Sequence, residues 1–172
     1  MLQELGCRYV IVGHSERRSM YGEDDALVGR KALAVLNAQM TPIVCIGETM
    51  TEREAGQVEA VLQRQLDAVL QIIGSAGLAQ VVVAYEPVWA IGSGVAATPA
   101  QISAVLGWVR AWLVSHSSAA QQIRILYGGS VKPDTAAAIF ALPDCDGGLI
   151  GGASLVAADF AGICTAAQAC VE

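Results

Sequence analysis

The sequence has few positive charges, with 10 lysine and arginine residues against 16 aspartate and glutamate residues and a formal net charge of −6 at pH 7. A nucleic-acid partner requires a basic stripe to neutralise phosphates, so this balance argues against one. No apolar run approaches the roughly 20 residues of a membrane span, and the first residues do not resemble a signal peptide. We therefore expect a soluble, cytoplasmic protein that binds neither nucleic acid nor membrane.

Paired cysteines are also lacking. The five cysteines are an odd number, and no two have the Cys-x-x-Cys spacing of a metal site. Most of them lie among apolar residues, which suits reduced thiols that pack as small hydrophobic groups. The sequence predicts no metal site.

Hydrophobic residues are abundant at 54%, against 15% charged residues, which indicates one domain with a large buried core. Short apolar segments alternate with longer amphipathic ones, and this order predicts parallel strands joined by right-handed helical crossovers. A Thr51–Glu54 capping box is expected to open the second helix. Strands are expected at 9–12, 42–46, 81–85, 123–127 and 147–150, and helices at 25–39, 51–73, 101–116, 133–142 and from 160 onward.

A glutamate stands at the end of the most apolar strand segment, residues 81–85. Pro87 cannot continue the ladder, and burying an unpaired Glu86 carboxylate at that strand end costs several kcal/mol. An apolar loop with glycines at Gly92 and Gly94 follows, and Thr98 then starts a helix. Glu86 is either a structural residue paired with a cation or a general base beneath a loop that excludes water. The whole string favours the base.

A histidine occupies the end of an earlier strand segment. His14 follows Gly13, and Ser15-Glu16 is expected to begin a short helix. Backbone N–H groups and the positive end of a helix disfavour an imidazolium, so a neutral His14 could donate to a carbonyl oxygen. A hydrogen-bonded structural histidine is the other interpretation. With Glu86 at a later strand end, catalysis is favoured.

Two glycine pairs follow the last two strand segments, in Gly128-Gly129-Ser130 and Gly151-Gly152. Glycines let backbone N–H groups approach an anion closely, and a following helix N-terminus adds a favourable dipole. Either pair alone could be a simple tight turn. Together with Gly92 they predict a phosphate site built from neutral N–H groups.

Five ordered motifs resemble the triosephosphate isomerase family: Tyr9–Arg18, Pro42–Glu48, Val81–Pro99, Ile123–Val131 and Gly147–Ser154. The resemblance implies an α/β fold, a partial (β/α)8 TIM barrel with five parallel strands equivalent to strands 4–8, in which residues 1–172 form a single incomplete barrel domain. It also implies interconversion of dihydroxyacetone phosphate and glyceraldehyde 3-phosphate, in glycolysis and gluconeogenesis, without a cofactor. The implied catalytic residues are His14 and Glu86, the implied phosphate ligands are Gly92, Ser130, Gly151 and Gly152, and the implied supporting residues are Glu16 and Cys45. For Glu16, a solvated or structural role is equally open.

The same resemblance implies that the first three βα units of the family are missing, with an asparagine, a phosphate-neutralising lysine and the loop that interlocks the family's homodimer. Ser93 and Val95 replace residues that many relatives have in the loop. Two other readings stay open. One is a different phosphate-binding barrel, and the other is an inactive partial barrel that only binds anions or associates with itself.

Overall fold

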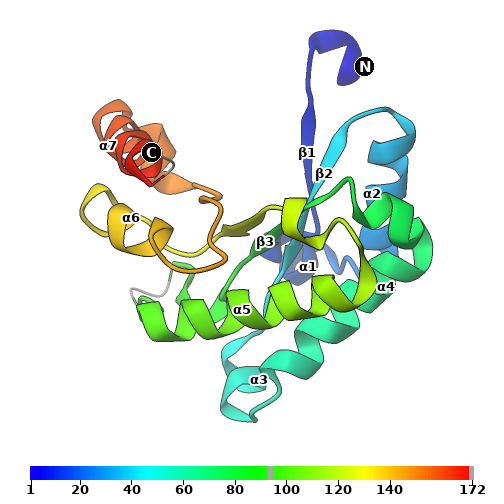
Figure 1. The fold of residues 1–172 in the computed structure, drawn as a ribbon, viewed down its shortest axis with the longest axis horizontal. Helices are drawn as coiled ribbons and strands as arrows, with labels where there is room; N and C mark the ends of the chain where they lie inside the picture. Colours follow the sequence, from blue (N-terminus) through cyan, green and yellow to red (C-terminus); the bar gives the residue numbers. More distant parts are fainter. Residues whose placement is uncertain (93–94, 171–172) are drawn as a thin grey trace.

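Four parallel strands form one sheet in the chain order β1-β2-β3-β4 in the computed structural model, which describes residues 1–92 and 95–170 (Figure 1). Neighbouring strands pair in register, with Val12 opposite Val44 and Cys45 opposite Ala84. The parallel order requires a crossover after every strand, as the sequence predicts. The strands are β1 Tyr9–Val12, β2 Thr41–Ile46, β3 Val82–Tyr85 and β4 Ile125–Tyr127.

Helices supply the crossovers. The longer ones, α2, α4 and α5, pack against one another and against the sheet, whereas α6 and α7 pack together at the far end of the sheet from α2 (Figure 1). The α-helices are α1 Ser15–Tyr21, α2 Asp25–Asn37, α3 Met50–Glu54, α4 Val58–Leu78, α5 Pro99–His116, α6 Pro133–Phe140 and α7 Ala157–Ala169, and the 3-10 turns are η1 Gln3–Leu5, η2 Val88–Ala90, η3 Ala120–Gln122 and η4 Gly152–Leu155. None of the helices in the described ranges is long and apolar enough to cross a membrane.

Strand β3 is the centre of the core, since all four of its residues are buried. A strand that is covered on both faces has a continuous apolar sequence, and this is why residues 81–85 could be predicted as a buried strand. The buried hydrophobic cluster extends from Val12 on β1 through Tyr85 to Ile163 on α7. Strand β1 differs: Tyr9 and Ile11 are about half exposed, at 48% and 49%.

The expected fifth strand is not confirmed, because the sheet of the described residues has four. Residues 147–150 run beside β4 but make only an isolated parallel bridge, between Tyr127 and Gly148. Tyr127 donates to the carbonyl of Gly147 at 3.0 Å and accepts from the amide of Leu149 at 2.9 Å. Gly147 has φ 143°, a conformation outside the β region of other residues, so the segment departs from regular strand geometry.

The expected helix over 51–73 is two helices, and its capping box lies two residues earlier. Thr49 accepts from the amide of Glu52 at 3.4 Å, and the Glu52 carboxylate accepts from the Thr49 amide at 2.8 Å. Gly56, with φ 69°, then interrupts the helical conformation between α3 and α4. The capping box of Thr98 and Gln101 at the start of α5 is confirmed.

A glycine without room for a side chain lets β2 and β3 end side by side. A Cβ on Gly47, just after β2, would lie 1.8 Å from the backbone carbonyl oxygen of Glu86. Gln65 of α4 satisfies both backbone polar groups of Gly47, accepting from its N–H at 2.8 Å and donating to its carbonyl at 3.1 Å.

We predict that Gly47→Ala lowers the free energy of unfolding by about 3 kcal/mol, because a methyl group in this position must displace the backbone at Glu86. Urea unfolding followed by circular dichroism measures it. Gly107→Ala, in α5 with no atom within 4 Å of the added Cβ, is the control and should raise stability by up to about 1 kcal/mol. Equal stability of Gly47→Ala and the unmodified chain would contradict the expectation.

Candidate active site

Glu86 is fixed at the end of β3 with only 2% of its surface exposed. Its backbone N–H donates to the carbonyl of Ile46 at 2.8 Å, which continues the β2–β3 ladder by one residue. On the other side, Gly128 donates to the carbonyl of Tyr85 at 2.7 Å. Backbone hydrogen bonds to the chain on both sides of β3 therefore fix the point from which the Glu86 side chain projects.

The Glu86 carboxylate is bound by residues that follow β1. The amide of Ser15 donates to Oε2 at 3.0 Å, the Ser15 hydroxyl donates to Oε1 at 3.3 Å, and Nε2 of His14 lies 3.0 Å from Oε1. Strand β2 lies between β1 and β3 in the sheet, so this contact spans it. The sequence predicted His14 and Glu86 at separate strand ends, and the structure places their side chains in contact. Sequence reasoning missed the partner role of Ser15.

Burial raises the pKa of Glu86, because a charged carboxylate loses solvation in this site. The neighbouring His14 ring and hydrogen bonds from Ser15 and Cys45 act in the opposite direction, and the net effect is a raised pKa. The Cys45 side chain is fully buried on β2. Burial, with the neighbouring Glu86 charge, raises the pKa of the Cys45 thiol well above its usual value, so the thiol stays protonated.

His14 is the N-cap of α1, and this role fixes its tautomer. Its Nδ1 accepts a hydrogen bond from the backbone amide of Glu16 at 3.3 Å. A neutral imidazole that accepts at Nδ1 carries its proton on Nε2, the nitrogen that faces Glu86. The Glu16 side chain itself is exposed beside the cavity. Among the hydrogen bonds and ion pairs of the described residues, the contact of Glu16 with this pair is that of its backbone amide.

The predicted phosphate-binding residues line the same cavity as His14 and Glu86, an open cavity of about 1030 Å³. Gly92, Ser130, Gly151 and Gly152 all contribute to its wall, and Cys45 lies behind Glu86, outside the lining. Ser93 and Gly94 of the predicted loop lie outside the described residues.

The two glycine pairs, Gly128-Gly129 and Gly151-Gly152, differ in whether the surrounding atoms leave room for a side chain. A Cβ on Gly128 would lie 2.9 Å from Cγ of Glu86, and one on Gly129 would lie 2.2 Å from the Tyr127 hydroxyl, so packing alone excludes a side chain at both. At Gly151 and Gly152 an added Cβ meets nothing within 4 Å. Neither of these two has a positive φ. Packing therefore does not explain the second pair.

A second buried carboxylate, Glu48, anchors the loop that follows Glu86. Its Oε1 accepts from the Tyr85 hydroxyl at 3.1 Å, the Trp89 indole at 2.7 Å and the Arg53 guanidinium at 3.0 Å. Arg53 also lies over the Trp89 ring, 4.7 Å from its centroid. Glu48 is fully buried, and its Oε2 has no hydrogen-bond partner among the described residues. The sequence signal, a carboxylate just after a strand, was present but did not identify these partners.

His14, Glu86 and the Gly128-Gly129 pair follow the carboxyl ends of parallel strands, which is where α/β barrel enzymes carry their active sites. No cluster of three or more His, Cys, Asp or Glu side chains suited to a metal ion occurs in the described ranges. Fold and site thus define an α/β protein with a parallel sheet and a cavity at the carboxyl ends of its strands.

Comparison with known proteins identifies the family. The family model described as triosephosphate isomerase matches residues 1–167. Proteins named triosephosphate isomerase are 60% identical in Azoarcus sp. (strain BH72) over 97% of this chain and 69% of the relative, and 55% identical in Nitrosomonas eutropha over 98% and 67%. One from Xanthomonas oryzae pv. oryzae is 53% identical over 99% of this chain and 68% of the relative. The chain belongs to the triosephosphate isomerase family, a family of isomerases.

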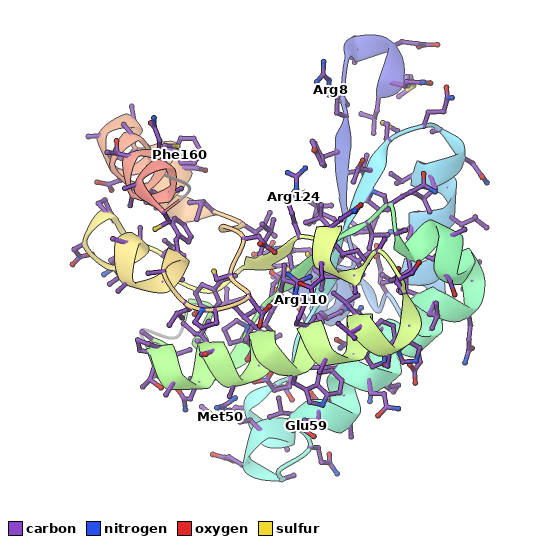
Figure 2. All side chains as sticks on the ribbon, in the orientation of Figure 1. Arg8, Met50, Glu59, Arg110, Arg124 and Phe160 are labelled. Carbon is purple, nitrogen blue, oxygen red and sulfur yellow. The ribbon has the colours of Figure 1, made fainter. Side chains whose placement is uncertain are left out.

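We predict that Glu86 makes stability depend on pH. A carboxyl whose pKa is raised in the folded state contributes most below its ordinary value of 4.5, and that contribution is lost as the pH rises through the folded-state pKa. From about pH 4.5 upward, the free energy of unfolding should therefore fall relative to that of Glu86→Gln, which has no charge to bury. Glu59→Gln, on the outer surface of α4 (Figure 2), is the control and should keep the pH dependence of the unmodified chain. If the free energy of unfolding of the unmodified chain instead rises with pH relative to that of Glu86→Gln, the raised pKa of Glu86 is contradicted.

Proposed function

We propose that this site interconverts dihydroxyacetone phosphate and glyceraldehyde 3-phosphate by proton transfer, with Glu86 as the base and His14 as the acid. The observation that carries the proposal is the Glu86–His14 contact at 3.0 Å on the wall of a cavity that Gly92, Gly151 and Gly152 also line. Membership of the isomerase family supports the same chemistry.

The described tautomer and the burial of Glu86 fit this reaction. Glu86 takes a proton from the hydroxymethyl carbon of dihydroxyacetone phosphate while Nε2–H of His14 protonates the carbonyl oxygen, which gives an enediol. Glu86 then returns the proton to the neighbouring carbon, and His14 regains a proton from the other oxygen. A carboxylate with a raised pKa removes a carbon-bound proton more readily than an ordinary one, because efficiency rises as the pKa of the base approaches the working pH.

Gly151 and Gly152 are proposed to bind the phosphate through their backbone N–H groups, with Gly92 and Ser130 completing the site. The space beside both glycines supports this role, since a side chain there would enter the cavity without disturbing the packing. Cys45 and Glu16 are proposed as supporting residues: the Cys45 thiol donates to Glu86, and the Glu16 amide orients His14.

We further propose that residues 1–172 form a single incomplete barrel domain, the part of a longer barrel that holds both proton-transfer groups. The chain spans 69% of the Azoarcus relative, and the half-exposed Tyr9 and Ile11 lie on the edge strand β1, where a further strand could pack. Cytoplasmic location and homodimeric assembly remain predictions from the family. The alternative is a partial barrel that binds anions or self-associates without catalysis, and we expect residues 1–172 alone to be a poor isomerase.

The base is tested by Glu86→Gln in a version of the protein extended to the full length of its relatives. Loss of the carboxylate should lower turnover by about 10²–10⁴-fold in a coupled isomerase assay, with a smaller change in KM. Glu23→Gln, which changes a buried carboxylate outside the cavity, is the control. Near-normal turnover by Glu86→Gln would eliminate the assignment.

The phosphate site is tested by Gly152→Val. Because the added side chain meets open space, the melting temperature should stay unchanged. In the extended version KM should rise, and inhibition by inorganic phosphate or sulfate should weaken, with Gly152→Ala showing a smaller effect in the same direction. Unaltered phosphate inhibition in both variants would show that the anion does not bind against these N–H groups.

A further inference from the structure

An arginine outside the cavity holds the backbone from which the catalytic histidine projects. Arg18 of α1 turns back toward the strand ends, and its Nε donates to the carbonyl of Gly13, the residue before His14, at 2.8 Å. Its Nη2 donates to the carbonyl of Cys45 on β2 at 3.3 Å. We infer that Arg18 is a positioning residue for His14 and Glu86, an inference that rests on the function proposed for this pair.

The contact with Cys45 occupies a gap in the ladder between β1 and β2. The pairs Tyr9–Thr41 and Val12–Val44, continued by one residue, place Gly13 opposite Cys45. In this register the Cys45 carbonyl would next receive an amide N–H of β1, but the chain leaves the sheet at Gly13, whose φ is 72°. The Arg18 guanidinium supplies a donor at that carbonyl, where the ladder ends.

The turn itself is packed against the guanidinium. A Cβ on Gly13 would lie 2.8 Å from Cγ1 of Val28 and 3.2 Å from Nη2 of Arg18. Val28 on α2 and Arg18 therefore confine the Gly13 backbone from two sides. Removing the guanidinium opens one of these sides and leaves the Gly13 carbonyl without its donor.

The guanidinium is in turn oriented by α2 and α4. Its Nη1 donates to Oδ1 of Asp25, the first residue of α2, at 2.6 Å, and Nε of Arg64 on α4 donates to Oδ2 of Asp25 at 3.0 Å. Arg18 and Asp25 are both largely shielded, with 17% and 20% of their side-chain surface exposed. A lysine keeps the charge, but its single nitrogen cannot replace three guanidinium nitrogens that each bind a different oxygen.

One side chain thus fixes the backbone beside both reacting groups. Arg18 binds the carbonyl of Gly13, the residue directly before His14. Arg18 also binds the carbonyl of Cys45, whose thiol donates to Glu86. Without Arg18 the His14 ring should lose its fixed orientation toward Glu86, although neither side chain contacts Arg18 in the described hydrogen bonds.

The test uses the 172-residue chain and reads His14 directly. The sequence contains only two histidines, His14 and His116, so ¹⁵N-labelled histidine gives two sets of ring signals, assigned with His116→Gln. In the unmodified chain we expect His14 as the Nε2–H tautomer. In Arg18→Met we expect the His14 signals to move toward the exchange-averaged tautomers of a free imidazole, with His116 unchanged.

Arg110→Met is the matched control, because Arg110, which is labelled above α5 in Figure 2, makes the same kind of cluster beside β4, the strand at the other edge of the sheet from β1. It donates to the carbonyls of Ala120 and Ile123 at 2.5 and 2.7 Å and to Asp144 and Asp146, both at 2.9 Å. Arg110→Met should lower the melting temperature but leave the His14 signals in place.

Unchanged His14 signals in folded Arg18→Met would overturn the inference, and so would an equal change in Arg110→Met, which would mark a general loss of stability. If Arg18→Met does not fold, Arg18→Lys is measured in its place. The inference then predicts that the ring signals of His14 shift in Arg18→Lys, and unchanged signals would overturn it. The spectra are recorded without substrate, so this inference can fail while the Glu86→Gln assay still supports the proposed function, and the reverse.

Discussion

The burial of one carboxylate is the constraint on which this site depends. The Glu86 carboxylate is shielded from water at the end of β3 and is hydrogen-bonded by Ser15 and His14, which follow β1. The ends of two strands that do not neighbour each other in the sheet must therefore meet across β2. Gly47, at the end of β2, permits this, because any side chain there would strike the Glu86 backbone.

Charged clusters behind the cavity hold these strand ends in place. Arg18 and Asp25 support the turn that carries His14. Glu48, which Arg53 pairs with, supports the chain on both sides of Glu86, because it binds Tyr85 before it and Trp89 after it. In both clusters a buried or shielded ion binds several partners, so loss of one partner leaves others unsatisfied. The cavity itself is lined by glycines, apolar residues such as Ile91 and Ile150, and a few polar groups. The residues of the two charged clusters, Arg18, Asp25, Glu48 and Arg53, do not belong to this lining.

The strands, the helix order and the pair of His14 and Glu86 could be predicted because buried strands are apolar runs, and a polar residue at the end of such a run is conspicuous. Ser15, Arg18 and the partners of Glu48 could not, since their contacts depend on how strand ends far apart in the sequence meet. The fifth strand was overpredicted: an apolar, glycine-containing run resembles a strand, but Gly147 leaves the β region. The break at Gly56 was missed because only three residues separate α3 from α4 and none of them is a proline.

Exchange of hydrogen at the substrate carbon tests the central claim, that the Glu86 carboxylate removes a carbon-bound proton. Dihydroxyacetone phosphate is incubated in D₂O with the protein extended to the full length of its relatives, and proton NMR follows the hydroxymethyl signal. The account predicts deuterium incorporation by the unmodified protein and none above the buffer rate when residue 86 is glutamine. Equal incorporation by both proteins would show that another group removes the proton, and would contradict the account.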